Sequence, residues 1–332
     1  MGDVAMTSPV VSELRKKYPE LNIVILTRPF FNPFFRDIPD ISFVDIDLKA
    51  RHKGFYGIFR LFREIKNNYK IDYVADLHDV LRSKILRNLF QFNGAKVSNI
   101  NKGRTEKKQL TRQKDKIFKP LKSTFSRYIE VFDKLGFKLN NSTDNLTSAQ
   151  ADIPQKIYSE VGDKDVSWIG ISPFAQHQGK IYPLVKLEKV IEILNKEDGL
   201  KIFIFGGGEK EKKISEEWGS MYKNTYSVIG KLSLTEELDL ISNLDVMLSM
   251  DSSAMHMSSL VGTPAVSVWG ATHPYAGFMG YGQDYNNAVQ IDMECRPCSV
   301  YGNKPCYKRN YPCLNEITPD MIINKILNVI AK

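Results

Sequence analysis

Short apolar runs alternate with longer segments of helical periodicity along most of the chain. The runs have the length and composition of buried parallel strands, and the segments between them repeat apolar residues at the three- and four-residue spacing of helices. We predict strands at 22–26, 43–46, 73–77, 168–172, 201–205, 226–229, 246–250 and 265–269, and helices at 9–17, 55–67, 125–135, 187–195, 235–242, 252–261 and 318–330. This alternation is typical of an α/β protein with doubly wound parallel sheets, whose ligands bind at the carboxyl ends of the strands.

A polar, turn-rich stretch at 138–155 lacks periodicity and separates the two halves of this pattern. Because 332 residues suffice for two cores of ordinary size, we predict an N-terminal domain over 1–150 and a C-terminal domain over 151–316. The last segment, 317–332, is predicted to be a helix that crosses back to the first domain.

The most informative stretch is Asp245–Thr272, which holds a strand, a polar turn, a helix and a second strand. Asp251, Ser252 and Ser253 stand at the turn, where the unpaired N–H groups of a helix start attract an anion such as a phosphate. His256 lies one helical turn further on. In the structural alternative, Asp251 only caps the helix and His256 only packs.

The charge is unevenly distributed along the chain. Residues 1–150 carry 28 basic against 16 acidic side chains, whereas residues 151–332 carry 18 against 22. The basic half favours an anionic partner, such as an anionic membrane surface or a phosphorylated lipid substrate. The alternative is a solvated basic surface that binds nothing.

Nine basic residues lie between Asn101 and Ser123, where only Glu106 and Asp115 oppose them. Nucleic acid is not expected as the partner, because this stretch has few aromatic residues for base stacking and matches no recognisable binding module. No run approaches the roughly 18 apolar residues of a membrane-spanning helix, and the N-terminus lacks the apolar core of a signal peptide. We therefore expect a cytoplasmic protein.

The stretch from Asp251 to Pro274 also carries the pattern D-S-x-x-x-H, followed by G-T-P and W-G-x-T-x-P. It resembles the donor-site signature of the family 9 glycosyltransferases, the bacterial lipopolysaccharide heptosyltransferases. The resemblance implies the GT-B architecture, in which two Rossmann-like domains with doubly wound parallel sheets face a central cleft. It also implies a metal-independent, inverting transfer of a heptose-type sugar from an ADP-activated donor to a lipid A/core lipopolysaccharide acceptor.

The same resemblance assigns roles to individual residues. Gly2-Asp3 matches a loop pair whose aspartate is the catalytic base. Lys180, shortly before Tyr182-Pro183, matches a lysine that serves catalysis at the donor's pyrophosphate, with tyrosine in place of the usual tryptophan. The implied donor-binding residues are Ser172, Glu211, Leu232, Asp251, Ser252, Ser253 and His256, with Glu209 as a second candidate for the ribose contact of Glu211.

The chain departs from the family pattern at its N-terminus. In the family a strand precedes the Gly-Asp pair, but Met1 leaves no residues for that strand. Either the natural start lies further upstream or part of the sequence is missing. If the strand is truly absent, the first sheet lacks a member, and Asp3 is at worst a disordered terminal residue.

Candidates for acceptor binding come from the first half. Asp76, His78 and Arg82 follow the carboxyl end of the strand at 73–77, although Asp76 and His78 fit equally well as caps of the next helix. The basic stretch supplies three further candidates, Lys107, Lys108 and Arg112.

All four cysteines fall in one segment with the spacing C-x2-C-x7-C-x6-C, as Cys295, Cys298, Cys306 and Cys313. In a cytosolic chain this pattern favours a structural zinc site over disulfides, although the second pair is spaced unlike that of a zinc ribbon. Cysteine-rich segments at this place also recur in heptosyltransferases, which implies a loop-stapling role without a part in catalysis. No cofactor is expected for the reaction itself.

These observations lead to one main hypothesis and three alternatives. The main hypothesis is a monomeric enzyme, peripherally associated with the inner leaflet of the cytoplasmic membrane, that uses an ADP-sugar donor and an anionic lipid-linked saccharide acceptor. The alternatives are a family member with another nucleotide-sugar donor, a sugar-nucleotide epimerase on the same fold, and a non-catalytic protein that binds saccharides or anions.

Overall fold

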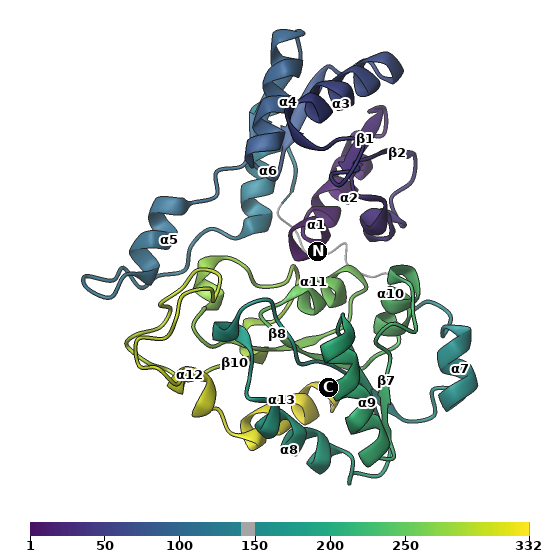
Figure 1. Cartoon of the computed structure of the whole chain (residues 1–332), viewed down its shortest axis with the longest axis vertical. Helices are drawn as coiled ribbons and strands as arrows, with labels where there is room; N and C mark the ends of the chain where they lie inside the picture. Colours follow the sequence, from purple (N-terminus) through teal and green to yellow (C-terminus); the bar gives the residue numbers. More distant parts are fainter. Residues whose placement is uncertain (141–149, 332) are drawn as a thin grey trace. The chain divides into compact units, whose positions relative to one another are not determined.

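The computed structural model describes residues 1–140 and 150–331, which form two compact units (Figure 1). The N-terminal unit contains Met1 and residues 3–102 and 123–140, and the C-terminal unit contains Gly2 and residues 103–122 and 150–331.

Two domains were predicted, over 1–150 and 151–316, and the bounds of the two units differ from them at Gly2 and at 103–122. Residues 103–122, which hold most of the basic stretch, belong to the C-terminal unit. Most of the predicted linker at 138–155 lies outside the described residues.

The C-terminal unit is built on a six-stranded parallel sheet with the order β10-β9-β8-β5-β6-β7. Its strands are β5 (Ser167–Ser172), β6 (Leu200–Ile204), β7 (Thr225–Ser227), β8 (Val246–Met250), β9 (Ala265–Val268) and β10 (Ala288–Val289). From β5 the chain runs outward to β7 on one side, and from β8 outward to β10 on the other. The predicted doubly wound sheet is confirmed for this unit, and its switch point lies between β5 and β8.

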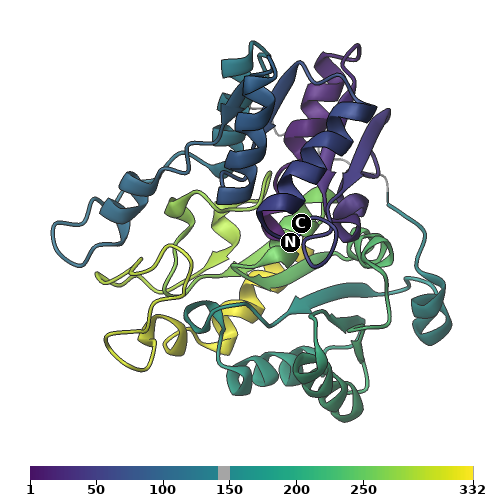
Figure 2. The same cartoon turned by 45° about the horizontal axis from the view of Figure 1, so that its top comes forward.

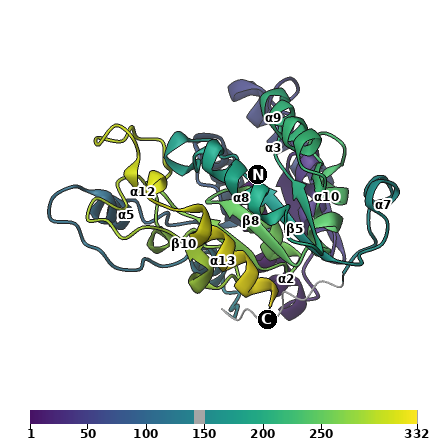
Figure 3. The ribbon, with the colours of Figure 1, turned by 90° about the horizontal axis from the view of Figure 1, so that it is seen from below.

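Helices cover both faces of this sheet (Figures 1 and 3). The helices of the unit are α5 (Arg104–Thr111), α7 (Gln155–Val161), α8 (Leu184–Leu194), α9 (Glu209–Met221), α10 (Leu234–Ser242), α11 (Ser253–Leu260), α12 (Pro312–Asn315) and α13 (Pro319–Ile330), and its 3-10 helices are η2 (Gln178–Lys180), η3 (Pro274–Ala276) and η4 (Tyr285–Asn287). On one face α8, α9 and α13 share a core that includes Leu187, Trp218 and Ile322. On the other face α10 packs beside α11.

The last helix contradicts one expectation. In α13 the hydroxyl of Thr318 accepts a hydrogen bond from the N–H of Met321, and Ile322, Ile323 and Ile326 are buried in the core of the C-terminal unit. The prediction that this helix crosses back to the first domain is therefore wrong, because its apolar stripe already packs against α8 and the sheet of its own unit.

The N-terminal unit contains two separate pairs of parallel strands. β1 (Ile23–Thr27) pairs with β2 (Ile41–Asp45), and β3 (Tyr73–Asp76) pairs with β4 (Lys96–Asn99). Among the described residues no strand joins these pairs into one sheet. Their side chains are correspondingly accessible, since Leu26 and Tyr73 are 38% and 41% exposed, whereas all of β8 is buried.

The helices of the N-terminal unit are α1 (Gly2–Ala5), α2 (Ser8–Lys17), η1 (Pro29–Phe35), α3 (Gly54–Asn68), α4 (Leu81–Phe92) and α6 (Thr124–Leu135). The helices predicted at 9–17, 55–67 and 125–135 are confirmed to within one residue. α3 and α4 lie side by side and share the apolar core of Leu61 and Phe90 (Figures 1 and 2). No helix in the described part of either unit is long and apolar enough to cross a membrane.

Specific contacts hold the segment 103–122 to the C-terminal unit. The Nζ of Lys116 donates to three backbone carbonyls of the cysteine-containing segment at 2.9 to 3.2 Å. These acceptors are the carbonyl oxygens of Glu294, Arg296 and Pro297. The ring of Phe118 lies 5.1 Å from that of His273, and the N–H of Leu121 donates to the carbonyl of Tyr275 at 2.9 Å. Part of the basic stretch therefore stabilises the fold of the C-terminal unit.

Candidate functional site

Two charged side chains meet where the carboxyl ends of β5 and β8 lie side by side. Lys180 ends η2, in the loop after β5, and Asp251 directly follows β8. The Nζ of Lys180 lies 2.9 Å from Oδ2 of Asp251, and the two side chains are 16% and 3% exposed. This ion pair marks the switch point of a doubly wound sheet, which is where such sheets bind their ligands.

The carboxylate of Asp251 keeps unused acceptor capacity. Its Oδ2 is engaged by the Lys180 ammonium at 2.9 Å, and no other group in the described chain donates a hydrogen bond to that oxygen. A buried carboxylate is costly unless a cation or hydrogen-bond donors compensate it. The arrangement favours a ligand hydroxyl as the missing donor.

The start of α11 has no side-chain cap in the described structure. The hydroxyls of Ser123, Ser233 and Thr318 each cap the helix that follows them. In contrast, within the described structure the Ser252 side chain makes no capping hydrogen bond to α11, and its Oγ lies 3.1 Å from Oγ of Ser249. The first amides of α11 and the Lys180 ammonium together suit an anion.

The prediction for His256 agrees with the structure in position. His256 is 6% exposed and lies one turn into α11. A Cβ at Gly2 would lie 3.0 Å from Cδ2 of the His256 ring, so a side chain at position 2 would press on this histidine. Asp3 follows in α1, where its side chain is exposed. The N-terminus is thus helical rather than irregular, and the role of Asp3 as a base stays a prediction.

Close backbone packing fixes the stem of Lys180. The N–H of Gly179 donates to the carbonyl of Gly302 at 3.2 Å, and the N–H of Ala271 donates to the carbonyl of Gly179 at 2.9 Å. A Cβ at Gly302 would lie 2.7 Å from Cγ of Lys180. The lysine is therefore held by residues of two distant loops. Sequence analysis missed both glycines, because a glycine needed for close approach has no motif of its own.

A buried arginine organises the loop after β9. The guanidinium of Arg296 is 3% exposed and donates to five oxygens. The acceptors are the carbonyls of Trp269, Gly270, Thr272 and Ile291 and the side chain of Gln290. This arginine shapes the W-G-x-T segment that passes Gly179. No sequence signal distinguishes it from the other basic residues of the chain.

His273 is a second missed residue of this region. It is 7% exposed, and its Nδ1 accepts a hydrogen bond from the N–H of Tyr275 at 3.1 Å. Burial, together with the charges of Arg296 and Lys116, lowers the pKa of His273 to about 4. The imidazole is therefore neutral near pH 7, with its proton on Nε2.

The remaining donor-site candidates lie in the C-terminal unit. Ser172 is buried at the carboxyl end of β5. Glu211 accepts a hydrogen bond from the N–H of Gly207 at 2.8 Å through Oε2, so it braces the glycine turn after β6, whereas Glu209 is exposed. Leu232 is half-buried in the turn before α10.

Among the acceptor candidates, Asp76 has a structural role. Its Oδ1 accepts hydrogen bonds from the N–H groups of His78 and Asp79, and its Oδ2 pairs with Arg87 at 2.9 Å. These contacts favour the alternative in which Asp76 stabilises the turn before α4. His78 and Arg82 are exposed and stay predictions.

The three candidates from the basic stretch differ in accessibility. Lys107 is 5% exposed, and its ammonium lies 3.9 Å from the centroid of the Phe278 ring. Lys108 and Arg112 are exposed on or next to α5. Only the latter two present their side chains to solvent.

The four cysteines are free thiols. Burial and the neighbouring thiols raise the pKa of Cys298, and burial raises the pKa of Cys313 to about 11. In the described part of the chain, however, no group of three or more His, Cys, Asp or Glu side chains lies close enough to hold a metal ion. This arrangement does not fit a zinc ion, and the structural zinc site stays a prediction.

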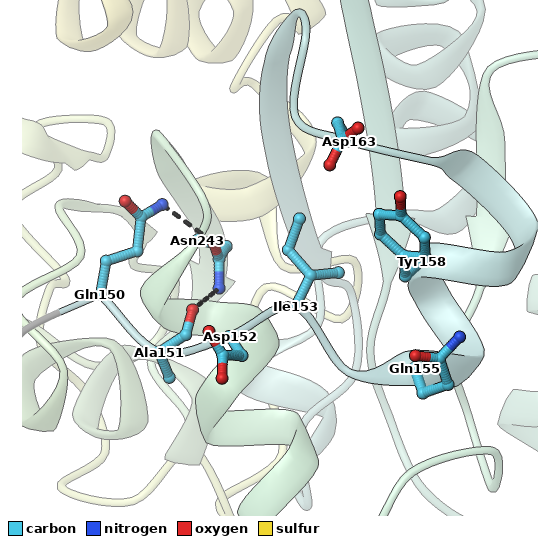
Figure 4. A pocket seen from close by; sticks show the side chains of 8 residues that line it. All are labelled: Gln150, Ala151, Asp152, Ile153, Gln155, Tyr158, Asp163 and Asn243. Carbon is cyan, nitrogen blue, oxygen red and sulfur yellow. Dashed lines mark hydrogen bonds between the residues drawn. The ribbon is translucent and has the colours of Figure 1, made fainter.

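A pocket elsewhere in the C-terminal unit does not coincide with the charged pair. It lies between the chain before α7 and the end of α10, where Gln150 Nε2 donates to Asn243 Oδ1 at 2.8 Å and Asn243 Nδ2 donates to the carbonyl of Ala151 at 2.9 Å (Figure 4). Asn243 and Asp163 precede the strands β8 and β5, so the pocket lies at the amino edge of the sheet. Ligands of doubly wound sheets bind at the opposite edge.

Comparisons with known proteins give the family of the chain. Residues 58–307 match the family described as glycosyltransferase family 9 (heptosyltransferase). The chain is 24% identical over 290 residues to lipopolysaccharide heptosyltransferase 1 of Campylobacter coli, covering 83% of this chain and 82% of the relative. It is 26% identical over 286 residues to lipopolysaccharide heptosyltransferase 3 of Escherichia coli, covering 82% of this chain and 80% of the relative.

Solved structures show the same fold. A glycosyl transferase family 9 protein from Veillonella parvula superposes with a TM-score of 0.76 at 20% identity, covering 99% of this chain and 94% of that one. ADP-heptose lps heptosyltransferase II of Escherichia coli superposes with a TM-score of 0.67 at 14% identity, covering 99% of this chain and 96% of that one. The fold is therefore GT-B, with two Rossmann-like domains, as the resemblance implied. Since the family match covers most of the sequence, the chain belongs to glycosyltransferase family 9, the heptosyltransferase family.

Proposed function

We propose that this glycosyltransferase moves a heptose from ADP-heptose to a saccharide acceptor of lipopolysaccharide type. The names of its relatives support this donor and acceptor, because they are heptosyltransferases that act on lipopolysaccharide or lipooligosaccharide. The observation that carries the proposal is the Lys180–Asp251 pair, which directly precedes the start of α11, a helix without a side-chain cap.

The donor's diphosphate binds at this pair in the proposed mechanism. The amides of Ser252 and Ser253 donate to phosphate oxygens, and the Lys180 ammonium neutralises the charge that grows as the pyrophosphate leaves. Asp251 accepts a hydrogen bond from a sugar hydroxyl through its unused oxygen, and His256 orders the turn. These contacts place the anomeric carbon for attack.

The rest of the nucleotide lies along the carboxyl edge of the C-terminal sheet. Glu211, already bound to the glycine turn, accepts hydrogen bonds from the ribose, and Leu232 contacts the adenine. Ser172 lies beside the donor at the end of β5. These roles need no metal ion.

The chemical step is a direct displacement with inversion. Asp3 removes the proton from an acceptor hydroxyl while that oxygen bonds to the anomeric carbon of the donor. The bond between the anomeric carbon and the β-phosphate oxygen breaks at the same time, and ADP leaves with the electron pair.

The acceptor is expected to be anionic and anchored in a lipid. The exposed basic side chains of Arg82, Lys108 and Arg112 and the imidazole of His78 suit phosphate groups on such a saccharide. The enzyme then works as a monomer in the cytoplasm, in peripheral contact with the inner leaflet of the cytoplasmic membrane.

Nucleotide titration tests the donor assignment. Isothermal titration should detect ADP and give a weaker signal with UDP. The Lys180→Ala variant should bind ADP about 10- to 100-fold more weakly, because a charge-assisted contact of about 1.5–3 kcal/mol is lost. Lys196→Ala, which removes an exposed lysine at the end of α8, is the matched control.

Two outcomes would contradict the proposal. A strong preference for UDP would exclude an ADP-linked donor, and binding of neither nucleotide would exclude the donor site. Asp3→Ala should keep ADP binding but lose transfer, measured by mass spectrometry of the glycosylated acceptor. Transfer at the normal rate would show that another group is the base.

A further inference from the structure

The start of α3 presents three aromatic side chains to solvent. Phe55, Tyr56 and Phe59 are 58%, 90% and 36% exposed. Their rings contact one another, with centroids 6.5 Å apart for Phe55 and Tyr56 and 4.9 Å apart for Phe55 and Phe59. The same helix buries Ile58 and Leu61 on its inner side, so the exposed rings are not needed for the core. We call these three residues the aromatic patch.

The chain before α3 supports the aromatic patch on a fixed base. The carboxylate of Asp47 accepts hydrogen bonds from three N–H groups of the preceding turn, and Nδ1 of His52 accepts the N–H of Asp47 at 3.1 Å. The other ring nitrogen of His52 lies 3.0 Å from Glu64 of α3. A Cβ at Gly57 would lie 2.3 Å from the carbonyl carbon of His52, so the helix packs directly on the turn.

Exposed basic residues lie close to the aromatic patch in the sequence, in the turn before α3 and within α3. They are Lys49, Arg51, Lys53, Arg60 and Arg63. The acidic residues of the same stretch, Asp47 and Glu64, are already engaged by the turn amides, by His52 and by Arg51. The surface thus combines an apolar centre with a positive border.

We infer that the aromatic patch and its basic border dock the enzyme on an anionic lipid bilayer. Contiguous exposed aromatic side chains on a rigid element mark an interaction site. Aromatic rings favour the interface between lipid and water, and lysine and arginine favour anionic headgroups. Aromatic residues alone or basic residues alone bind a membrane weakly, whereas the two kinds together give stable peripheral association.

The location of the patch suits a lipid-linked acceptor. Because α3 follows β2, its first turn lies at the carboxyl edge of the N-terminal strands. The exposed acceptor candidates His78 and Arg82 likewise follow the carboxyl end of β3, which belongs to the other strand pair of the same unit. The inference rests on the proposed function for this acceptor, whereas membrane docking itself is measured without donor or acceptor.

The basic stretch at 103–122 is the competing surface. Two of its lysines are engaged within the protein, since Lys107 lies over Phe278 and Lys116 binds three carbonyls. Its exposed aromatic ring, Phe118, packs on His273 and Tyr275. We therefore assign the main docking role to α3.

A tryptophan probe at position 56 tests insertion directly. The three native tryptophans, Trp168, Trp218 and Trp269, are at most 3% exposed, so the new indole of Tyr56→Trp would be the one accessible to lipid. Vesicles of phosphatidylethanolamine and phosphatidylglycerol should shift its emission to the blue, and brominated lipid should quench it. Phe92→Trp, at the exposed C-terminal end of α4, is the control and should not respond.

Vesicle sedimentation with the full chain measures the two contributions separately. Replacing the three patch residues with serine should weaken binding to the anionic vesicles by about tenfold or more. Lys53→Gln with Arg60→Gln should weaken it by about fivefold for each charge removed. Lys16→Gln with Lys17→Gln removes the same charge from the end of α2 and should have little effect. Circular dichroism and ADP titration verify that each variant is folded.

Three results would overturn the inference. The first is unchanged vesicle binding by the serine variant, and the second is equal binding to neutral phosphatidylcholine vesicles. The third is a loss confined to the KM for a soluble, delipidated acceptor, which would make the patch a saccharide site. Failure of ADP binding in the unmodified enzyme would instead refute the proposed function and leave docking intact.

Discussion

The ammonium of Lys180 and the carboxylate of Asp251 lie 2.9 Å apart although 70 residues of sequence separate them. They meet because β5 and β8 are neighbours in the sheet, so the loops that leave these strands start side by side. In the enzyme without donor, each side chain compensates the charge of the other. In the proposed mechanism, a bound diphosphate replaces this carboxylate as the anion beside the lysine.

The pair should contribute to stability as a unit. Asp251→Asn removes one charge and leaves the other buried, which should lower the free energy of unfolding by about 2–4 kcal/mol. Adding Lys180→Met removes the remaining charge and should restore part of that loss. Chemical denaturation of both single variants and the double variant forms a double-mutant cycle. Simple additivity of the two losses would show that the side chains are not coupled.

Gly302 should be required for the position of Lys180. In Gly302→Ala the new Cβ would lie 2.7 Å from Cγ of Lys180, and the residue has a φ of +73°. We expect a weaker affinity for ADP and a stability loss of about 1–2 kcal/mol from the left-handed backbone. Gly199→Ala has a similar φ of +87° with nothing within 4 Å of the Cβ. This control should lose stability but keep its ADP affinity; an equal ADP loss in both variants would refute the steric argument.

Arg296→Lys should be strongly destabilising although it keeps the charge. The shorter ammonium has no planar fork and leaves most of the five acceptors of Arg296 without a donor. We expect a loss of about 3 kcal/mol in the free energy of unfolding. Thermal unfolding measures it, and Arg63→Lys on the exposed side of α3 should change little. A wild-type melting temperature for Arg296→Lys would contradict the assigned role.

Acid should destabilise the protein through His273. Its pKa is about 4 in the folded state and about 6.5 in the unfolded state, so the unfolded chain binds more protons between these values. The contribution is complete above pH 6.5 and is lost as the pH falls towards 4. We expect His273→Asn to reduce this loss by on the order of 3 kcal/mol. Denaturation curves at several pH values give the slope of the unfolding free energy against pH for the wild-type protein and for the variant. Equal slopes would exclude His273 as the source.

Transfer should not depend on a divalent cation. The proposed stabilisation of the leaving pyrophosphate comes from Lys180 and backbone amides, which are fixed in the protein. The rate of ADP release should therefore be unchanged after treatment with a chelator. A loss of activity that added magnesium ions reverse would instead indicate a metal ion at the pyrophosphate.

Metal analysis of the same samples also tests whether the four cysteines bind zinc.

The C-terminal unit was the more predictable half of the fold. Its strands are fully buried and therefore read as continuous apolar runs, as in 246–250, which the structure reproduces without a shift. The N-terminal strands are more exposed, and the prediction missed β4, whose sequence KVSN has one strongly apolar residue. It also missed α4, since that helix begins with an apolar residue rather than a capping side chain.

Sequence patterns located the candidate residues that follow strands, and they missed the residues whose contacts depend on tertiary packing. Asp251, Ser252 and Lys180 stand directly after or near strand ends, so the pattern locates them. The contribution of Arg296 depends on carbonyls up to 27 residues away, and that of Gly302 on a close approach to η2. The prediction for the last helix was wrong because an amphipathic stripe does not identify the surface it covers.

The division of the N-terminal unit into two strand pairs has a consequence for local unfolding. Each of its strands has one edge outside any described ladder, whereas the amides of β8 lie between two neighbouring strands. Amide hydrogens of β1 and β3 should therefore exchange with deuterium through local opening, and those of β8 only through global unfolding. In mild denaturant the C-terminal unit should therefore stay folded longer than the N-terminal unit.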